Sequence, residues 1–220
     1  EANSIHKAPS LPRPIFEGTT SPVIFTSAAG NINDFKRQPL LVNPLSFSGP
    51  CMVKGDVNGD GLEDVYVGGG NGQAGALYIQ QKNNRFIQKA QAAFEADKMS
   101  EDADAVMADI NKDGFKDLYV ASGGYHNYSA SDVLLQDRLY LNDGKGNFTK
   151  AANALPEMRV SKSCVRAVDV NGDGFIDLFV GGRNIPGQYP ETPPSYLLVN
   201  DGKGNFTDKI SQLAPQLQHA

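Results

Sequence analysis

The chain has 220 residues, 40% of them apolar and 20% charged, which is typical of one globular domain or two small ones and excludes a disordered chain. No apolar run approaches the roughly 18 residues of a membrane span, and 20 basic against 25 acidic residues give a formal charge of −5, without a basic footprint for nucleic acid. The 23 glycines and 13 prolines, with no tryptophan, favour many short strands over long helices.

The first part of the chain carries few signals of regular structure. Residues 1–21 are rich in proline, serine and threonine and are predicted to form an extended arm or linker. The chain begins at Glu1 with no charged and then apolar leader, so we interpret it as a processed or excised product that lacks its signal sequence. Two short runs of strand-forming residues follow, around residues 23–26 and 40–42.

An internal repeat organises the rest of the chain. The pattern DxNxDGxxD occurs at residues 56–64, 109–117 and 169–177, with starts 53 and 60 residues apart. In each copy a short apolar run precedes the loop, two β-type runs follow it, and a turn leads to a last strand. In two copies that turn is Asn-Asp-Gly-Lys-Gly-Asn-Phe, at residues 142–148 and 200–206, which is a strong hairpin signal.

Each repeat is therefore predicted to hold four antiparallel strands, the content of a β-propeller blade. The predicted fold is all-β, with complete repeats at residues 51–98, 99–157 and 158–220 and a partial blade at residues 22–50. The alternative is an antiparallel sandwich with decorated turns, although a sandwich does not need the same nonapeptide in each unit. Because this number of blades leaves open sheet edges, the chain is either a segment of a larger propeller or one copy in an assembly that covers the edges.

The three nonapeptides have the chemistry of calcium sites. Oxygen-bearing side chains stand at positions 1, 3, 5 and 9, and a glycine at position 6 permits a sharp turn, which suits a hard cation. Magnesium requires a tighter octahedron and should bind less well. The predicted ligands are these four side chains and the backbone carbonyl of position 7: Asp56, Asn58, Asp60, Leu62 and Asp64; then Asp109, Asn111, Asp113, Phe115 and Asp117; then Asp169, Asn171, Asp173, Phe175 and Asp177.

An EF-hand opens with the same residues, but it needs a bidentate glutamate at position 12 and a helix after it. Position 12 is Val67, Val120 and Val180 here, inside predicted strands. A solvated, Asx-rich turn without metal is the alternative for a single loop, and three copies in register argue against it. Because the carboxylates crowd each turn and repel one another, we expect calcium to stabilise the fold.

The segments DVNGDGLEDVYVGG, DINKDGFKDLYVASGG and DVNGDGFIDLFVGG, with LYLNDGKGNFT and YLLVNDGKGNFT, resemble the FG-GAP or VCBS repeats of integrin α-subunit propellers and bacterial envelope proteins. NDFKRQPLL at residues 33–41, and Gly181-Gly182-Arg183 before Tyr189-Pro190, are more specifically similar to the bacterial ASPIC/UnbV group of cartilage acidic protein-like proteins. The resemblance covers about residues 50–209. It implies a calcium-binding β-propeller, secreted or in the cell envelope, with the metal loop between the first two strands of each blade.

Two further groups of residues are candidates for a functional role. Cys51 and Cys164 occupy equivalent places in repeats separated by a whole blade, so two free, buried thiols are expected, with an intermolecular bridge as the alternative. His126, in Gly-Gly-Tyr-His-Asn-Tyr at residues 123–128, and the proline-rich residues 183–195 lie between second and third strands. Both connections should lie on one face, away from the acidic loops, and either contact a sugar or peptide or form solvated crossings.

No nucleophile elbow, paired histidine and serine or cysteine, phosphate-binding loop or isolated carboxylate pair is recognisable, so no catalytic residue is predicted. The expected function is a non-enzymatic interaction module of a secreted or cell-envelope protein, stabilised by three calcium ions, with loops presented to a protein or glycan partner. Self-association is expected if the propeller is not closed. The alternative is an accessory or partial domain of a polysaccharide-degrading enzyme, and RNA is not an expected partner.

Overall fold

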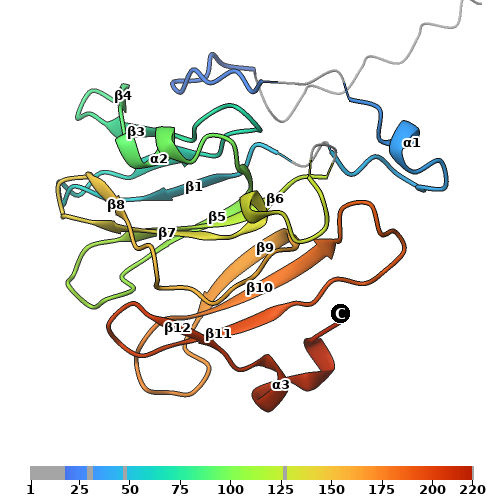
Figure 1. Ribbon diagram of the computed structural model, residues 1–220. Helices are drawn as coiled ribbons and strands as arrows, with labels where there is room; N and C mark the ends of the chain where they lie inside the picture. The colour runs from blue at the N-terminus through green and yellow to red at the C-terminus, as the bar shows by residue number, and fades with distance from the viewer. Residues whose placement is uncertain (1–17, 29–31, 47–48, 126–127, 220) are drawn as a thin grey trace, which may run out of the picture.

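The computed structural model describes residues 18–28, 32–46, 49–125 and 128–219. Residues 1–17 of the arm predicted at residues 1–21 lie outside it, and residues 18–21 form no helix or strand. The strands form three separate four-stranded antiparallel sheets, in which spatial order follows chain order. In Figure 1 the sheet of β1 to β4 lies uppermost, the sheet of β5 to β8 lies below it, and the sheet of β9 to β12 is the lowest. This confirms the predicted all-β fold of three four-stranded repeats, and the three blades form an open stack.

The elements of the three blades are as follows. Blade 1 consists of β1 (Met52–Gly55), β2 (Asp64–Val67), β3 (Ala76–Gln80) and β4 (Phe86–Lys89). Blade 2 consists of β5 (Glu101–Ala108), β6 (Asp117–Gly123), β7 (Arg138–Asn142) and β8 (Phe148–Lys150). Blade 3 consists of β9 (Ser161–Val168), β10 (Asp177–Asn184), β11 (Tyr196–Asn200) and β12 (Phe206–Asp208).

Short helices connect and flank the blades. They are α1 (Asp34–Arg37), α2 (Ala92–Ala96), η1 (Val133–Leu135), α3 (Ile210–Leu213) and η2 (Pro215–Leu217). None of the helices in the described ranges has the length and apolar character that a membrane span requires.

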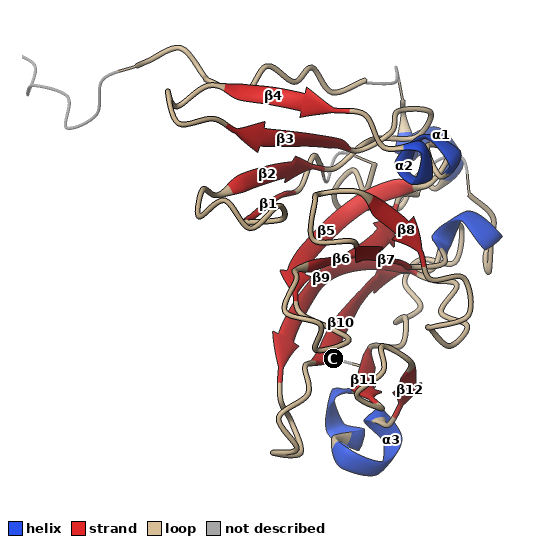
Figure 2. Ribbon diagram, turned by 90° about the vertical axis from the view of Figure 1, so that its left-hand side faces the viewer, coloured by secondary structure: helices blue, strands red, loops and turns tan. Residues whose placement is uncertain are grey.

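The apolar core lies between the sheets, because each sheet buries a face against its neighbour. Between blades 1 and 2, Phe94 of α2 packs edge-on against Tyr66 and Tyr140, with ring centroids 5.4 and 4.9 Å apart. Between blades 2 and 3, a second core includes the fully buried Tyr119 and Leu178. The first strands pack together, β1 near β5 and β5 near β9, where the sheets converge (Figure 2).

The two strands expected before the first repeat are not formed. The described residues of 22–50 contain α1 and otherwise irregular backbone. Residues 23–28 do lie on blade 1, but side chains hold them in place of a backbone ladder. The Tyr78 hydroxyl donates to the Ile24 carbonyl over 2.6 Å, and the Gln73 side chain accepts from the Ala28 N–H over 2.7 Å. The segment therefore covers blade 1 without adding a strand to it.

Candidate metal centres

The three nonapeptides join the first and second strands of their sheets, and we call them loop 1 (residues 56–64), loop 2 (109–117) and loop 3 (169–177). They lie at the same end of the molecule as the hairpins that join third and fourth strands, on the left in Figure 1. The connections between second and third strands lie at the opposite end. The loops therefore have the place in the blade that the repeat pattern predicts.

Loop 1 is closed by its own side chains. Asp56 accepts the Gly61 N–H over 2.9 Å, and the Asn58 amide donates to Asp60 over 3.1 Å. Gly61 has a φ of +82°, which a residue with a Cβ rarely adopts. Burial raises the pKa of Asp56, but the backbone N–H groups directed at it, that of Gly61 first, outweigh burial and lower the pKa below its usual range. The first carboxylate is thus held ionised.

Loops 2 and 3 repeat these contacts at the same positions. Asp109 accepts the Gly114 N–H over 3.0 Å, and Asp169 accepts the Gly174 N–H over 2.9 Å. Both glycines have positive φ, +89° and +79°. The Asn-to-Asp bond also recurs, from Asn111 to Asp113 over 2.9 Å and from Asn171 to Asp173 over 2.8 Å. Three sequences with different residues between the motif positions therefore adopt one loop conformation.

The ninth residue of each loop is fully buried and anchors the loop to the sheet. Asp117 accepts the Ile110 N–H of its own loop over 3.1 Å and the Asn142 N–H of β7 over 2.9 Å. Burial raises the pKa of Asp117 to about 6, against the opposing effect of these two hydrogen bonds. Asp64 and Asp177 make the equivalent pairs of bonds in blades 1 and 3.

The donor set of each loop fits a hard cation, because it consists of carboxylate, amide and carbonyl oxygens. Hydrogen bonds bring positions 3 and 5 together and turn position 1 back onto the glycine of position 6, while position 9 is bound to backbone N–H groups. Across the described part of the chain, no three acidic, histidine or cysteine side chains converge as a preformed metal cluster. The predicted ligands are thus neighbours in each loop, with position 9 beneath them as an anchor.

Two polar residues that the sequence did not single out also reach the loops. Asn142 and Asn200 end the third strands of blades 2 and 3, and each donates its side-chain amide to a loop of the preceding blade. Their signal in the sequence is the asparagine before Asp-Gly in both complete hairpins.

The far end of the blades is covered by the chain itself. Tyr125 and Tyr128 are fully buried, and Arg37 of α1 donates to both of their carbonyls. Gln38 accepts from the Tyr125 hydroxyl and donates to the Gly187 carbonyl over 3.3 Å. The two long connections therefore share one end, as expected, but the described part of the first is not an open platform for a ligand, and His126 and Asn127 lie outside the described residues.

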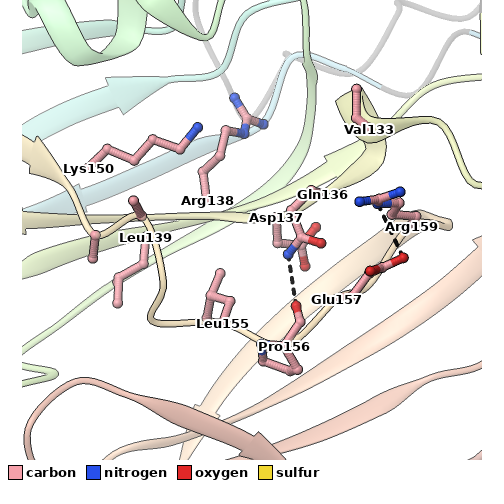
Figure 3. A pocket seen from close by; sticks show the side chains of 12 residues that line it. Val133, Gln136, Asp137, Arg138, Leu139, Lys150, Leu155, Pro156, Glu157 and Arg159 are labelled. Atoms are coloured by element: carbon pink, nitrogen blue, oxygen red, sulfur yellow. Dashed lines mark hydrogen bonds and ion pairs between the residues drawn. The ribbon is translucent and has the colours of Figure 1, made fainter.

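A pocket of about 340 Å³ lies between β7 and residues 151–159 (Figure 3). Its cationic side chains are already engaged: Arg138 pairs with Asp102 over 2.7 Å, and Lys150 pairs with Asp97 over 2.7 Å. The Gln136 amide crosses to the Pro156 carbonyl over 3.0 Å. This pocket is thus bounded by structural contacts of blade 2.

Cys51 and Cys164 are free and half-buried, where full burial was expected. Burial raises the pKa of the Cys51 thiol to about 12, and the charges of Asp102 and Asp104 add to the effect. A thiol that stays protonated at neutral pH is a poor nucleophile.

Three four-stranded blades with an acidic loop between the first and second strands define a repeat protein of the β-propeller class. The model of the FG-GAP-like repeat matches residues 56–120 and 122–180, which together are more than half of the chain. The chain therefore belongs to the FG-GAP-like repeat family, whose blades build interaction modules. No curated protein matches the chain.

Proposed function

We propose that this chain is a calcium-binding interaction module in which calcium has a structural role. The observation that carries the proposal is the shared conformation of loops 1, 2 and 3, each of which presents carboxylate and amide oxygens of positions 1, 3 and 5 at its surface. Since a solvated turn can form from many sequences, the retention of the same four oxygen-bearing side chains in all three loops favours a common ligand.

In each loop the cation would be held by four side chains and one backbone carbonyl. Bound calcium would supply positive charge where the carboxylates repel one another, and would cross-link the two ends of the loop. The ligands in loop 1 are Asp56, Asn58, Asp60, Leu62 and Asp64, and the residues of the same positions serve in loops 2 and 3.

The proposal is tested by thermal unfolding in EDTA, in excess calcium and in excess magnesium. Calcium should raise the melting temperature, because a ligand that binds only the folded state stabilises it, and magnesium should do so less. The rise should shrink stepwise in Asp60→Ala, Asp113→Ala and Asp173→Ala, and in their combinations.

Asp143→Ala is the matched control for these variants. Asp143 is also exposed and also closes a turn, accepting the Lys145 N–H over 2.9 Å, but it lies in the β7–β8 hairpin outside loops 1 to 3. It should keep the full calcium response. Equal melts in EDTA and calcium, together with no metal in the purified protein, would refute calcium binding.

The location and partner are proposed on separate grounds. FG-GAP repeats are typical of extracellular domains, and the ASPIC/UnbV-like segments point the same way, so we place the protein outside the cytoplasm, secreted or in the cell envelope. Its partner would be a protein or a glycan, and open sheet edges would favour self-association. A glycan panel reports both binding and cleavage: new reducing ends would favour the alternative, a domain of a polysaccharide-degrading enzyme, which no feature of the described residues supports.

A further inference from the structure

The side chain of Asn142 joins blade 2 to loop 1 of the preceding blade. Its Nδ2 donates to the Val57 carbonyl over 2.8 Å and to the Lys116 carbonyl of its own blade over 3.0 Å. Its Oδ1 accepts two N–H groups of its own hairpin, those of Gly144 and Gly146, each over 3.2 Å. One buried amide thus connects two successive acidic loops and a hairpin.

Asn200 makes the same set of contacts one blade later. Its Nδ2 donates to the Ile110 carbonyl in loop 2 over 2.8 Å and to the Ile176 carbonyl in loop 3 over 3.0 Å. Its Oδ1 again accepts from two hairpin glycines, Gly202 and Gly204. We call this set of hydrogen bonds the bridge. Because all four partners recur at equivalent positions, the bridge is a property of the repeat.

The bridge fixes the peptide groups between two predicted calcium ligands. Val57 stands between Asp56 and Asn58, its N–H is bound to Asp64 over 3.1 Å, and its carbonyl is bound to Asn142. Its side chain is only 1% exposed and lies beneath the hairpin of blade 2, where a Cβ at Gly146 would come within 3.2 Å of it. A residue held on all sides in this way limits the positions of both neighbouring side chains.

Loop 3 lacks this support. Val170, the equivalent of Val57 and Ile110, is 38% exposed, whereas each of the other two is 1% exposed. Its N–H keeps the bond to Asp177 over 3.0 Å, but no donor within the described ranges meets its carbonyl. The flanking ligands Asp169 and Asn171 are exposed as well.

Blade 1 has a glutamine at the position of the bridging asparagine. Gln80 stands where blades 2 and 3 have asparagine, and its backbone N–H binds Asp64 over 2.8 Å as theirs bind Asp117 and Asp177. The Gln80 side chain, however, stays in its own blade and accepts the Glu63 N–H over 3.1 Å. The asparagine is thus present in the two blades that follow an acidic loop, and replaced in blade 1, which follows none in this chain.

We propose that Asn142 and Asn200 are positioning residues for the calcium loop of the preceding blade, so that each of the first two sites depends on the blade that follows it. This inference rests on the calcium binding proposed above. Loops 1 and 2 are held in place by a neighbour before a cation arrives, and loop 3 is not. Loop 3 is therefore the weakest site, and docking of one further repeat against its exposed Val170 would strengthen it.

Amide hydrogen exchange tests the coupling, because it resolves peptides from each loop. The full chain is compared with Asn142→Ala and Asn200→Ala, first in EDTA and then at stepped free calcium. Asn142→Ala should speed exchange in residues 56–64 and leave residues 169–177 unchanged. Asn200→Ala should speed exchange in residues 109–117 and leave residues 56–64 unchanged. Each variant also perturbs the loop of its own blade, so the preceding loop carries the test.

The calcium series measures the effect on affinity. In Asn142→Ala the calcium concentration that half-protects loop 1 should rise by about tenfold, a factor equivalent to about 1.4 kcal/mol, as expected when a buried carbonyl loses its donor. In the unchanged protein loop 3 should require the most calcium. Asn147→Ala and Asn205→Ala are the controls, since these side chains donate to Asp143 and Asp201 within the same hairpins.

The outcomes separate this inference from calcium binding itself. Suppose that calcium protects all three loops of the unchanged protein. The coupling is then overturned, and calcium binding left intact, if Asn142→Ala weakens this protection only in loop 2 or equally in all loops. The same holds if Asn142→Ala weakens it no more than Asn147→Ala does. If calcium protects no loop of the unchanged protein, both calcium binding and the proposed effect on affinity are refuted. The exchange rates in EDTA would still show whether each asparagine holds the loop of the preceding blade. If Asn142→Ala does not fold, Asn142→Gln takes its place in the test. This variant has the residue found at position 80, and it should fold but lose the bridge.

Discussion

The Lys162 ammonium lies 2.9 Å from an Asp137 carboxylate oxygen, and both side chains are completely buried. Lys162 belongs to β9 of blade 3, whereas Asp137 directly precedes β7 of blade 2, so the ion pair crosses the interface between these blades. Asp137 also accepts the Tyr119 hydroxyl over 2.6 Å and the Ser122 N–H over 2.8 Å. This carboxylate therefore has partners from two blades.

Lys162→Met should destabilise the protein strongly, because it leaves the Asp137 charge buried without its cation. We expect the free energy of unfolding to fall by about 3–5 kcal/mol in urea denaturation, and the double variant with Asp137→Asn to recover part of the loss. Lys54→Met is the control, since Lys54 pairs with Glu63 at the surface and such pairs contribute less than about 1 kcal/mol. Equal losses in the two single variants would contradict the structural role of the buried pair.

Asp117 and Asp113 belong to the same loop but should behave differently on substitution. Asp117→Ala leaves two buried N–H groups unbound, so it should lower stability by about 3 kcal/mol even in EDTA. Asp113 is exposed, and Asp113→Ala should leave the EDTA melt nearly unchanged while removing part of the calcium response. Melts in EDTA and in calcium measure both effects. A normal EDTA melt for Asp117→Ala would show that the ninth position does not anchor the loop.

Glu101 should make the protein less stable as pH rises. Burial raises the pKa of Glu101, Asp102 raises it further, Arg183 opposes this, and Asp34 adds a small increase. A carboxyl group with a higher pKa in the folded state binds more protons there than in the unfolded chain, so stability falls as pH rises from its usual pKa through the raised value.

Glu101→Gln removes this dependence because glutamine carries no charge at any pH. Urea midpoints are measured from about pH 4 to about pH 8. The midpoint of the variant, relative to that of the unchanged protein, should increase as pH rises, and the variant should be the more stable of the two at neutral pH. If Glu101→Gln runs parallel to the unchanged protein over this range, the Glu101 carboxyl is not disfavoured by its surroundings.

Features set by neighbouring residues in the chain could be predicted from the sequence. The positive φ of Gly61, Gly114 and Gly174 follows from turn chemistry within nine residues, and the strand order of each blade follows from alternating runs and hairpin signals. In each loop, hydrogen bonds therefore join position 1 to position 6 and position 3 to position 5.

Features that depend on how blades pack could not be predicted in the same way. The contact between Asn142 and Val57 joins residues 85 positions apart. The asparagine before Asp-Gly marks the donor in the sequence, but nothing near it indicates a partner in the preceding blade. Residues 23–26 have strand-forming side chains, but they do not pair with either edge strand of blade 1. The side chains of Gln73 and Tyr78 bind the backbone of this segment instead. From the sequence, Tyr125 and Tyr128 were expected in a connection that contacts a ligand or is solvated. In the structure they are covered by a segment that lies about 90 residues earlier in the chain.

Arg37 fastens the covering segment, residues 32–46, to the far end of the blades. Arg37 of α1 donates to the Tyr125 carbonyl over 2.5 Å and to the Tyr128 carbonyl over 2.6 Å, and its guanidinium lies 5.0 Å from the centre of the Tyr125 ring. Two charge-assisted hydrogen bonds from one planar group are hard to replace. Arg37→Ala should therefore release α1 and raise the rate of limited proteolysis in residues 32–46 by at least about tenfold.

Two variants separate the role of the guanidinium from that of charge. Arg37→Lys keeps the charge but offers a single ammonium in place of a fork, so proteolysis should be faster than in the unchanged protein and slower than in Arg37→Ala. Lys36→Ala removes an exposed cation from the same helix and should leave the rate unchanged. If Arg37→Ala is cleaved no faster than Lys36→Ala, then Asp34, which accepts the Leu45 and Ser46 N–H groups, and Gln38 hold the segment without the arginine.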